Sequence, residues 1–251
     1  MHEIINFFLE PYKSASITNI LLEVVAATLG IISVFYAKKE NILVFPTGII
    51  STGIYIYLLS QWSLYGDLII NIYYTMMSVY GWYVWSKVSS SQTLSKTKKT
   101  NYKNNTEIQH TPITRTNTKD KAIATLIFIT TSFFVIFIYR YYNVMPNNLG
   151  FVDSVKYAFS NLTSGNLQKF RISVSFLDTF TTAAAFVAMW LMAVKKIENW
   201  TFWIATNIVS IPLYFVKGYG FTGIQYTVFL ILAILGYKEW KKVLNKKKSI
   251  L

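Results

Sequence analysis

Five polar or aromatic residues recur at helical spacing inside one long apolar run. They are Trp200, Trp203, Asn207, Ser210 and Tyr214, at steps of 3, 4, 3 and 4, so a helix places them on one face. Tryptophan and tyrosine offer flat rings for stacking, and an asparagine amide both donates and accepts hydrogen bonds. Because a polar side chain in lipid is costly, this face predicts a bundle interior or a solute path.

Three other apolar runs carry comparable polar residues. Together with the first face, they predict a central path for a small, planar solute with hydroxyl or amide groups. The residues are Thr47, Ser51 and Tyr55 in the second run, Asp67, Asn71, Tyr74, Ser78, Trp82 and Trp85 in the third, and Thr222, Gln225 and Tyr226 in the seventh.

Structural roles compete with solute binding for several of these residues. Trp82, Trp85 and Trp240 lie near predicted helix ends, where tryptophan also anchors a helix in the lipid interface. The serines can bond backbone carbonyls of their own helix. Asn71 and Asn207 lie deeper, and polar contacts between helices are the main alternative for them.

Three carboxylates, Glu23, Asp67 and Asp178, lie toward the same predicted ends of their helices. Gathered at an outer mouth, they would attract a cationic solute. Hydrogen bonding at the interface is the alternative. No chain of ionisable residues crosses the apolar runs, so the sequence predicts passive transport rather than proton coupling.

The composition argues against several other kinds of chemistry. There is no cysteine, and the only histidines, His2 and His110, lie outside the apolar runs, so we expect neither a metal site nor a cofactor. The sequence lacks a G-x-x-x-x-G-K-[ST] motif and a recognisable nucleophile–base pair, so we expect no enzyme. The net charge of +13 lies in loops and tails, which does not favour nucleic acid as a partner.

Helices that cross a lipid bilayer must position these residues. The chain is 53% hydrophobic and only 14% charged, against about 25% charged in soluble domains. Runs of roughly 18–20 apolar residues are long enough to span a bilayer. The sequence therefore predicts an all-α integral membrane protein with seven transmembrane helices, at 19–37, 42–59, 67–86, 121–141, 174–194, 200–217 and 221–239.

The two halves of the chain resemble each other. Glu23 and Asp178, Gly81 and Gly236, and Trp85 and Trp240 are each 155 residues apart, and KKEN at 38–41 resembles KKIEN at 195–199 with a spacing of 157–158. Such a repeat predicts two parallel three-helix units joined by a linking helix, a 3+1+3 arrangement.

The expected division of the chain follows from this arrangement. It comprises an extracytoplasmic or interfacial segment (1–18), a first bundle (19–87), a flexible cytoplasmic loop (88–120), the linking helix (121–141), an extracytoplasmic loop (142–173), a second bundle (174–240) and a basic cytoplasmic tail (241–251). In this division 18 of the 24 Lys and Arg residues lie on one side. The positive-inside rule then places the C-terminus in the cytoplasm and the N-terminus outside.

The stretch ENWTFW, followed by Asn207, IPLYF and GYKEW, resembles the PnuC family of bacterial nicotinamide riboside transporters. AMWLMAVKKIENW and Gly81-Trp82 agree, and the resemblance covers roughly residues 19–242. It implies a SWEET-like fold in the bacterial cytoplasmic (inner) membrane, facilitated diffusion of nicotinamide riboside, trapping by a cytoplasmic kinase and a homotrimer. The substrate residues that it implies are Trp203 and Asn207 first, then Trp200, Asn71, Tyr74, Gln225 and Tyr226, with Trp190 as a further candidate. Tyr214 joins these candidates because it lies on the same helical face as Trp203 and Asn207.

Other functions remain open from the sequence. A related transporter could carry thiamine or riboflavin, and a SWEET-type protein would carry a sugar. A membrane scaffold without transport is the alternative of another class, in which the polar residues join helices.

Overall fold

The computed structural model describes residues 16–61, 65–87, 111–141, 167–217 and 220–248. Of the predicted segments 1–18, 88–120 and 142–173, the parts 1–15, 88–110 and 142–166 lie outside the described residues. The described chain is helical apart from connecting segments and one isolated β-bridge, between Thr114 and Lys196. Its helices are α2 (Ile17–Lys38), α3 (Val44–Gln61), α4 (Tyr65–Ser86), α5 (Thr118–Tyr141), α7 (Leu167–Ala193), α8 (Asn199–Lys217) and α9 (Gly220–Lys248).

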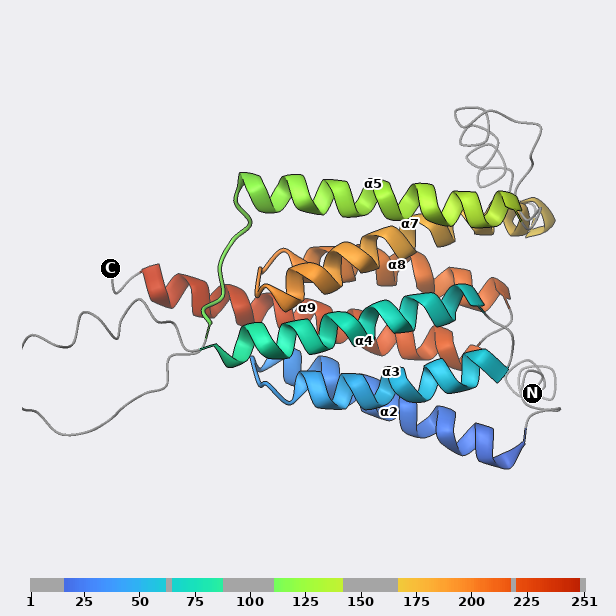
Figure 1. The fold of residues 1–251 in the computed structure, drawn as a ribbon, viewed down its shortest axis with the longest axis horizontal. Helices are drawn as coiled ribbons and strands as arrows, with labels where there is room; N and C mark the ends of the chain where they lie inside the picture. Colours follow the sequence, from blue (N-terminus) through green and yellow to red (C-terminus); the bar gives the residue numbers. More distant parts are fainter. Residues whose placement is uncertain (1–15, 62–64, 88–110, 142–166, 218–219, 249–251) are drawn as a thin grey trace, which may run out of the picture.

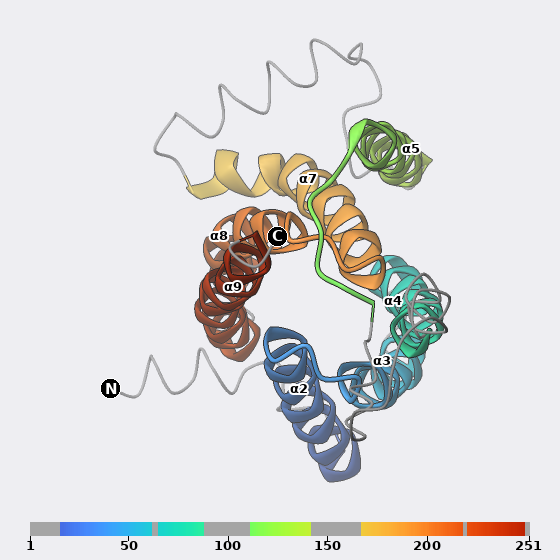
Figure 2. The same ribbon diagram turned by 90° about the vertical axis from the view of Figure 1, so that its left-hand side faces the viewer.

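Six of these helices form a closed ring (Figure 2). Around it, α2 packs on α3, α3 on α4, α4 on α7, α7 on α8, α8 on α9, and α9 returns to α2. Helix α5 lies outside the ring and packs on α7. In Figure 1, α2, α4, α7 and α9 run towards the end where the C-terminus lies, and α3, α5 and α8 run away from it.

The end of the ring at which α2, α4, α7 and α9 finish is called the basic end here. It carries Lys38, Lys39, Lys87, Lys195, Lys196, Lys241 and Lys242, together with Arg115 and Lys119 just before or within the start of α5. The opposite end holds Glu23, Asp67 and Asp178. Among the described residues, these three carboxylates therefore lie on the side of the ring away from most of the cations, and their gathering at an outer mouth stays a prediction.

Four helices, α2, α5, α9 and the part of α7 from Phe176 to Ala193, are long and apolar enough to cross a membrane. The other three described helices, α3, α4 and α8, are not among these four and include polar residues such as Thr47, Asn71 and Asn207. Large apolar side chains cover the outward faces, for example Met76, Phe133 and Phe137. An apolar outer surface of this kind fits a lipid environment.

Three helices extend past a predicted boundary by three residues or more. Helix α5 begins at Thr118 because Asn117 and Asp120 form a reciprocal cap at its start. The Asp120 N–H donates to Asn117 Oδ1 at 2.8 Å, and the Asn117 N–H donates to Asp120 Oδ2 at 2.9 Å. Helix α9 continues to Lys248, into the predicted tail, since Leu244 still packs on the apolar core. Helix α7 begins at Leu167, inside the predicted loop, with no proline or glycine to interrupt it.

The turns α2–α3 and α7–α8 have the same backbone structure, 155 residues apart. Glu40 and Lys195 have positive φ values of 55° and 59°. In the first turn the Asn41 N–H donates to the Tyr36 carbonyl at 3.0 Å, and in the second the Lys196 N–H donates to the Leu191 carbonyl at 2.8 Å. This is the Schellman arrangement that ends a helix. The match of KKEN with KKIEN at 157–158 residues is therefore wrong in register.

Candidate functional site

Four large aromatic side chains close the ring near the basic end. Phe45 meets Trp85 edge-on, with ring centroids 5.0 Å apart and an interplanar angle of 86°. Trp200 meets Trp240 in the same way, at 5.5 Å and 88°, and Trp85 lies 6.1 Å from Trp240. These four residues, called the aromatic layer below, are all buried. Edge-to-face packing is a favourable arrangement for aromatic rings.

Two indole N–H groups of the layer bind carbonyl oxygens at the ends of helices. Trp240 Nε1 donates to the Ala37 carbonyl of α2 at 3.1 Å, and Trp85 Nε1 donates to the Met192 carbonyl at the end of α7 at 3.3 Å. Trp85 is 2% exposed and Trp240 is 0% exposed. The alternative that these two residues anchor in the lipid interface is therefore wrong, whereas Trp82, 42% exposed, lies on the outer surface.

Glycines of α4 and α9 make room for the layer. A Cβ atom on Gly236 would lie 2.6 Å from the Trp200 ring, and one on Gly81 would overlap the Phe45 ring. In both places the added Cβ would lie too close to the aromatic ring for an ordinary side-chain contact. The paired glycines of the sequence repeat are thus explained by close packing.

A buried ion pair lies beside the layer. Lys195 is 3% exposed; its Nζ lies 3.1 Å from Glu40 Oε2 and 4.6 Å from the centre of the Trp85 ring. The pair joins the α2–α3 turn to the α7–α8 turn. A buried lysine needs such partners, because desolvation of its charge is costly.

Farther from the basic end, the ring interior contains a second group of aromatic and amide side chains. The Tyr74 and Trp203 rings meet edge-on at 6.1 Å, and the Tyr214 and Tyr226 rings stack at 4.8 Å with an interplanar angle of 17°. Gln225 is hydrogen-bonded to the Tyr55 hydroxyl. We call these six residues, from α3, α4, α8 and α9, the tyrosine cluster.

Asn207 is 2% exposed and lies between Trp203 and Tyr214 along the same face of α8. The predicted proximity of Trp203, Tyr74, Tyr214 and Tyr226 is therefore present. The sequence predicts Tyr55 only as part of a polar face of the second run. Spacing along one helix does not predict its contact with Gln225, which belongs to another helix. Asn71 is half-buried, and its Nδ2 donates to the Asp67 carbonyl of its own helix at 2.9 Å.

The carboxylates at the opposite end are close to the tyrosine cluster. Asp67 and Asp178 are near enough to Tyr214 and Tyr226 for their charges to act on the tyrosine hydroxyls, and Glu23 is near enough to Tyr55. Asp178 Oδ2 also accepts a hydrogen bond from the Tyr139 hydroxyl of α5 at 3.2 Å. Negative charge therefore lies beside a group of aromatic faces, which is an arrangement suited to a cation.

Two predicted substrate residues lie apart from the cluster. Trp200 belongs to the aromatic layer. Trp190 packs against the apolar cluster of Ala124, Val187 and Leu191, which joins α5 to α7. Among the residues that the structure describes, no three His, Cys, Asp or Glu side chains gather as a metal site would require.

Comparisons with known proteins agree on one family. The family described as "Nicotinamide mononucleotide transporter" matches residues 20–242. The nicotinamide riboside transporter PnuC of Escherichia coli (strain K12) is 23% identical over 224 residues, 87% of this chain and 84% of that protein. The transporter of the same name from Neisseria mucosa is 23% identical over 229 residues, 88% of this chain and 72% of that protein.

A shorter match and a solved structure complete the comparison. The riboflavin/roseoflavin transporter RibM of Streptomyces davaonensis is 32% identical over 63 residues, 25% of this chain and 30% of that protein. A crystal structure of the vitamin B3 transporter PnuC has the same fold, with a TM-score of 0.58 at 20% identity, covering 90% of this chain and 83% of that one. Because the family match spans nearly the whole chain, this protein belongs to the nicotinamide mononucleotide transporter family.

Proposed function

We propose that all seven helices cross the membrane, as two parallel three-helix repeats, α2–α4 and α7–α9, joined by α5. The equal spacing of 155 residues between corresponding features supports this arrangement, since it relates Glu40 to Lys195 and Trp85 to Trp240. Helices α3, α4 and α8 tolerate polar residues because their inner faces line the ring. The excess of Lys and Arg at the basic end supports a cytoplasmic C-terminus and an extracytoplasmic N-terminus, in the bacterial inner membrane.

The proposed function is facilitated diffusion of nicotinamide riboside. The observation that carries it is the tyrosine cluster. It places aromatic faces from both repeats, together with the amide of Gln225, inside one ring of helices. Transporters built from repeats bind their solute at such an interface between repeats. The family match supports a vitamin B3 compound as the solute.

The chemistry of the cluster suits this solute. Nicotinamide riboside is a planar cation with a carboxamide and ribose hydroxyls. Stacking and cation–π contact with Trp203 and the tyrosines suit the ring. The amides of Asn207 and Gln225 suit the carboxamide and hydroxyls, and Asp67 and Asp178 suit the positive charge.

Metabolic trapping would give the uptake its direction. A cytoplasmic kinase that phosphorylates the riboside would produce an anion that cannot return through a site built for a cation. The proposal includes a homotrimer, which the outer apolar faces of the helices could form within the membrane.

Counterflow in proteoliposomes tests this function. Vesicles loaded with unlabelled nicotinamide riboside should transiently accumulate the labelled compound without an ion gradient. Failure to accumulate it, with the protein folded and inserted, would contradict the proposal. Riboflavin is the second candidate, favoured by the similarity to RibM, and riboflavin counterflow without that of nicotinamide riboside would select it.

A further inference from the structure

A short extended segment crosses the basic end of the ring before α5 begins (Figure 2). We call residues 111–117 the strap. The part of the predicted flexible loop 88–120 that the structure describes begins with it. Ile113 is 4% exposed and packs in the same apolar cluster as Trp85, Trp200 and Trp240. The strap is thus part of the closure at the basic end.

Hydrogen bonds tie the strap to both halves of the ring. On the α4 side, Thr111 Oγ1 donates to the Val84 carbonyl at 2.7 Å. On the α7–α8 side, the Thr114 N–H donates to the Lys195 carbonyl at 3.1 Å, and the Ile197 N–H donates to the Thr114 carbonyl at 3.0 Å. The strap therefore bridges the seam at which α4 packs on α7.

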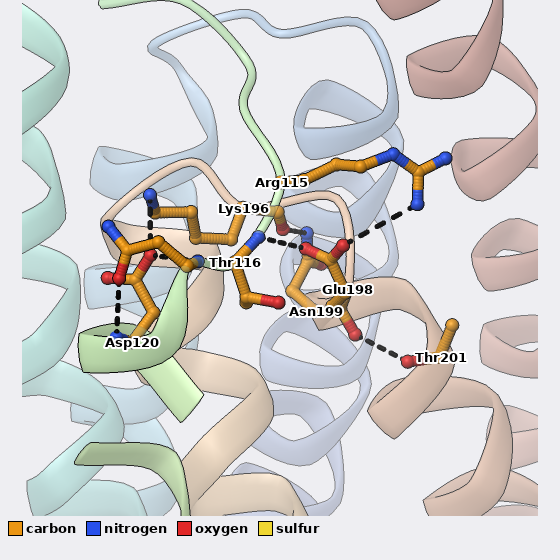
Figure 3. Close-up of polar contacts among 8 residues, drawn as sticks. Arg115, Thr116, Asp120, Lys196, Glu198, Asn199 and Thr201 are labelled. Carbon is orange, nitrogen blue, oxygen red and sulfur yellow. Dashed lines mark hydrogen bonds and ion pairs between the residues drawn. The ribbon is translucent and has the colours of Figure 1, made fainter. Parts of the chain in front are cut away.

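Side chains strengthen this attachment, as Figure 3 shows. The Thr116 N–H donates to Glu198 Oε2 at 2.9 Å, and Arg115 lies 3.8 Å from the same carboxylate. Lys196 pairs with Asp120 of α5 at 2.8 Å. These contacts continue the attachment from the α7–α8 turn into the first turn of α5.

The two halves meet at a second seam, where α9 packs on α2. There Trp240 bonds the Ala37 carbonyl, as Trp85 bonds Met192 at the first seam. A further polar link there is the ion pair of Lys38 with Glu239, at 3.2 Å, in which Lys38 is 12% and Glu239 44% exposed. An ion pair with one partner at the surface contributes little to stability, and this seam is not crossed by the strap, so the α2–α9 seam is the weaker of the two.

We propose that the strap fixes the α4–α7 seam as the hinge, so that the basic end opens for solute release by separation of α2 from α9. The inference rests on the proposed transport function. Two equivalent seams would give an opening with no preferred side. The strap adds several hydrogen bonds and a buried isoleucine to one seam only, and a transition that breaks fewer contacts is favoured.

Thiol labelling tests the inference without any solute, because the natural chain has no cysteine. The reporter is Met189→Cys, a buried position in the cluster that contains the layer. An impermeant thiol reagent is applied to detergent-purified protein, and the labelling rate is measured in Trp240→Phe and Trp85→Phe backgrounds. Each substitution keeps an aromatic ring and removes one indole N–H at one seam.

We expect about fivefold faster labelling in Trp240→Phe, because the loss of one hydrogen bond raises the population of the open state by about that factor. In Trp85→Phe we expect little change in the labelling rate. Adding Thr114→Pro to Trp85→Phe removes a strap N–H and should restore fast labelling, whereas Thr114→Ala, which keeps that N–H, should not. Equal rates in the two tryptophan variants, or faster labelling in Trp85→Phe, would overturn the inference.

Cross-linking with a short bifunctional thiol reagent provides a second test, in transport. A lock across α2–α9, in Lys38→Cys/Glu239→Cys, should stop uptake while nicotinamide riboside still binds. A lock of the strap to its turn, in Thr114→Cys/Lys196→Cys, should leave uptake unchanged, with the single-cysteine variants as controls. Loss of uptake on locking the strap would overturn the inference, whereas absence of binding in the uncross-linked protein would instead contradict the proposed function.

Discussion

The aromatic layer and the tyrosine cluster occupy the same ring of helices but differ in symmetry. In the layer, each residue has a counterpart 155 positions away with the same role: Trp85 and Trp240 donate to helix ends, and Phe45 and Trp200 lie against the glycines Gly81 and Gly236. In the tyrosine cluster the counterparts differ. Tyr74 corresponds to Phe229, and Trp203 to Gly48.

The difference indicates which requirement acts on each region. The layer joins two similar halves, so the same contacts can serve both. A solute such as nicotinamide riboside has a ring, a carboxamide and a sugar in fixed order, so its site needs different groups on the two sides. The symmetric frame therefore holds an asymmetric lining.

The largest effect is expected from adding one methyl group to the layer. Gly236→Ala should lower the free energy of unfolding by about 3 kcal/mol, because the new Cβ would overlap the Trp200 ring. The measurement is a denaturant titration in detergent micelles. The control is Gly53→Ala, whose Cβ would meet nothing within 4 Å and which should stabilise α3 slightly. Equal effects of the two substitutions would show that the layer is not tightly packed.

The second effect is on binding rather than stability. Trp203→Ala should weaken nicotinamide riboside binding by about 2 kcal/mol, or roughly thirtyfold, since it removes a stacking face from the cluster. Calorimetry measures the affinity, and Trp82→Ala, on the outer surface, is the matched control. If Trp82→Ala weakened binding as much, the cluster would not be the site.

The ion pair beside the layer should matter less. Glu40→Gln leaves Lys195 buried without its carboxylate partner, and we expect a loss of about 1.5 kcal/mol in the free energy of unfolding. Glu198→Gln keeps a side-chain oxygen that can accept the Thr116 N–H and loses the ion pair with the exposed Arg115, so it should cost below about 0.5 kcal/mol. A larger loss in Glu198→Gln would reverse the assigned importance of the two pairs.

The smallest effect is expected from a single hydroxyl in the cluster. Tyr55→Phe removes the hydrogen bond to Gln225 and should weaken binding about fivefold, with the amide of Gln225 less well positioned. Tyr57→Phe, an exposed position on the same helix, should leave the affinity unchanged. Identical affinities in both variants would remove Tyr55 from the account.

Helical spacing predicted much of this structure from the sequence. The seven predicted helices are all present, and the face of Trp203, Asn207 and Tyr214 lies inside the ring because its period is that of a helix. The start of α5 was predictable too, since Asn117 followed by Asp120 is a capping pattern. The lysines around this pattern make the composition of the segment resemble that of a loop, so the predicted helix begins at residue 121 instead of Thr118.

Contacts between distant segments could not be predicted in the same way. Nothing in the local sequence shows that Trp85 bonds Met192, 107 residues away, or that the strap pairs with the α7–α8 turn. The correct register between the two turns could not be predicted, because the Lys-Lys pair that the two sequences share does not occupy equivalent backbone positions. The equivalent positions are Glu40 and Lys195, which both have positive φ. The apolar run around Trp190 does not show which of its faces meets another helix, so the packing of Trp190 on the cluster between α5 and α7 could not be predicted.

Calorimetric titration of nicotinamide riboside into the purified parent protein and Asn207→Ala tests the central claim most directly. Asn207 is buried on the face that joins Trp203 to Tyr214. The account predicts that nicotinamide riboside binds to the parent and binds at least about tenfold more weakly to the variant. The variant lacks the amide, which could form two hydrogen bonds with the solute. Unchanged affinity in a folded Asn207→Ala variant would contradict the assignment of the solute site.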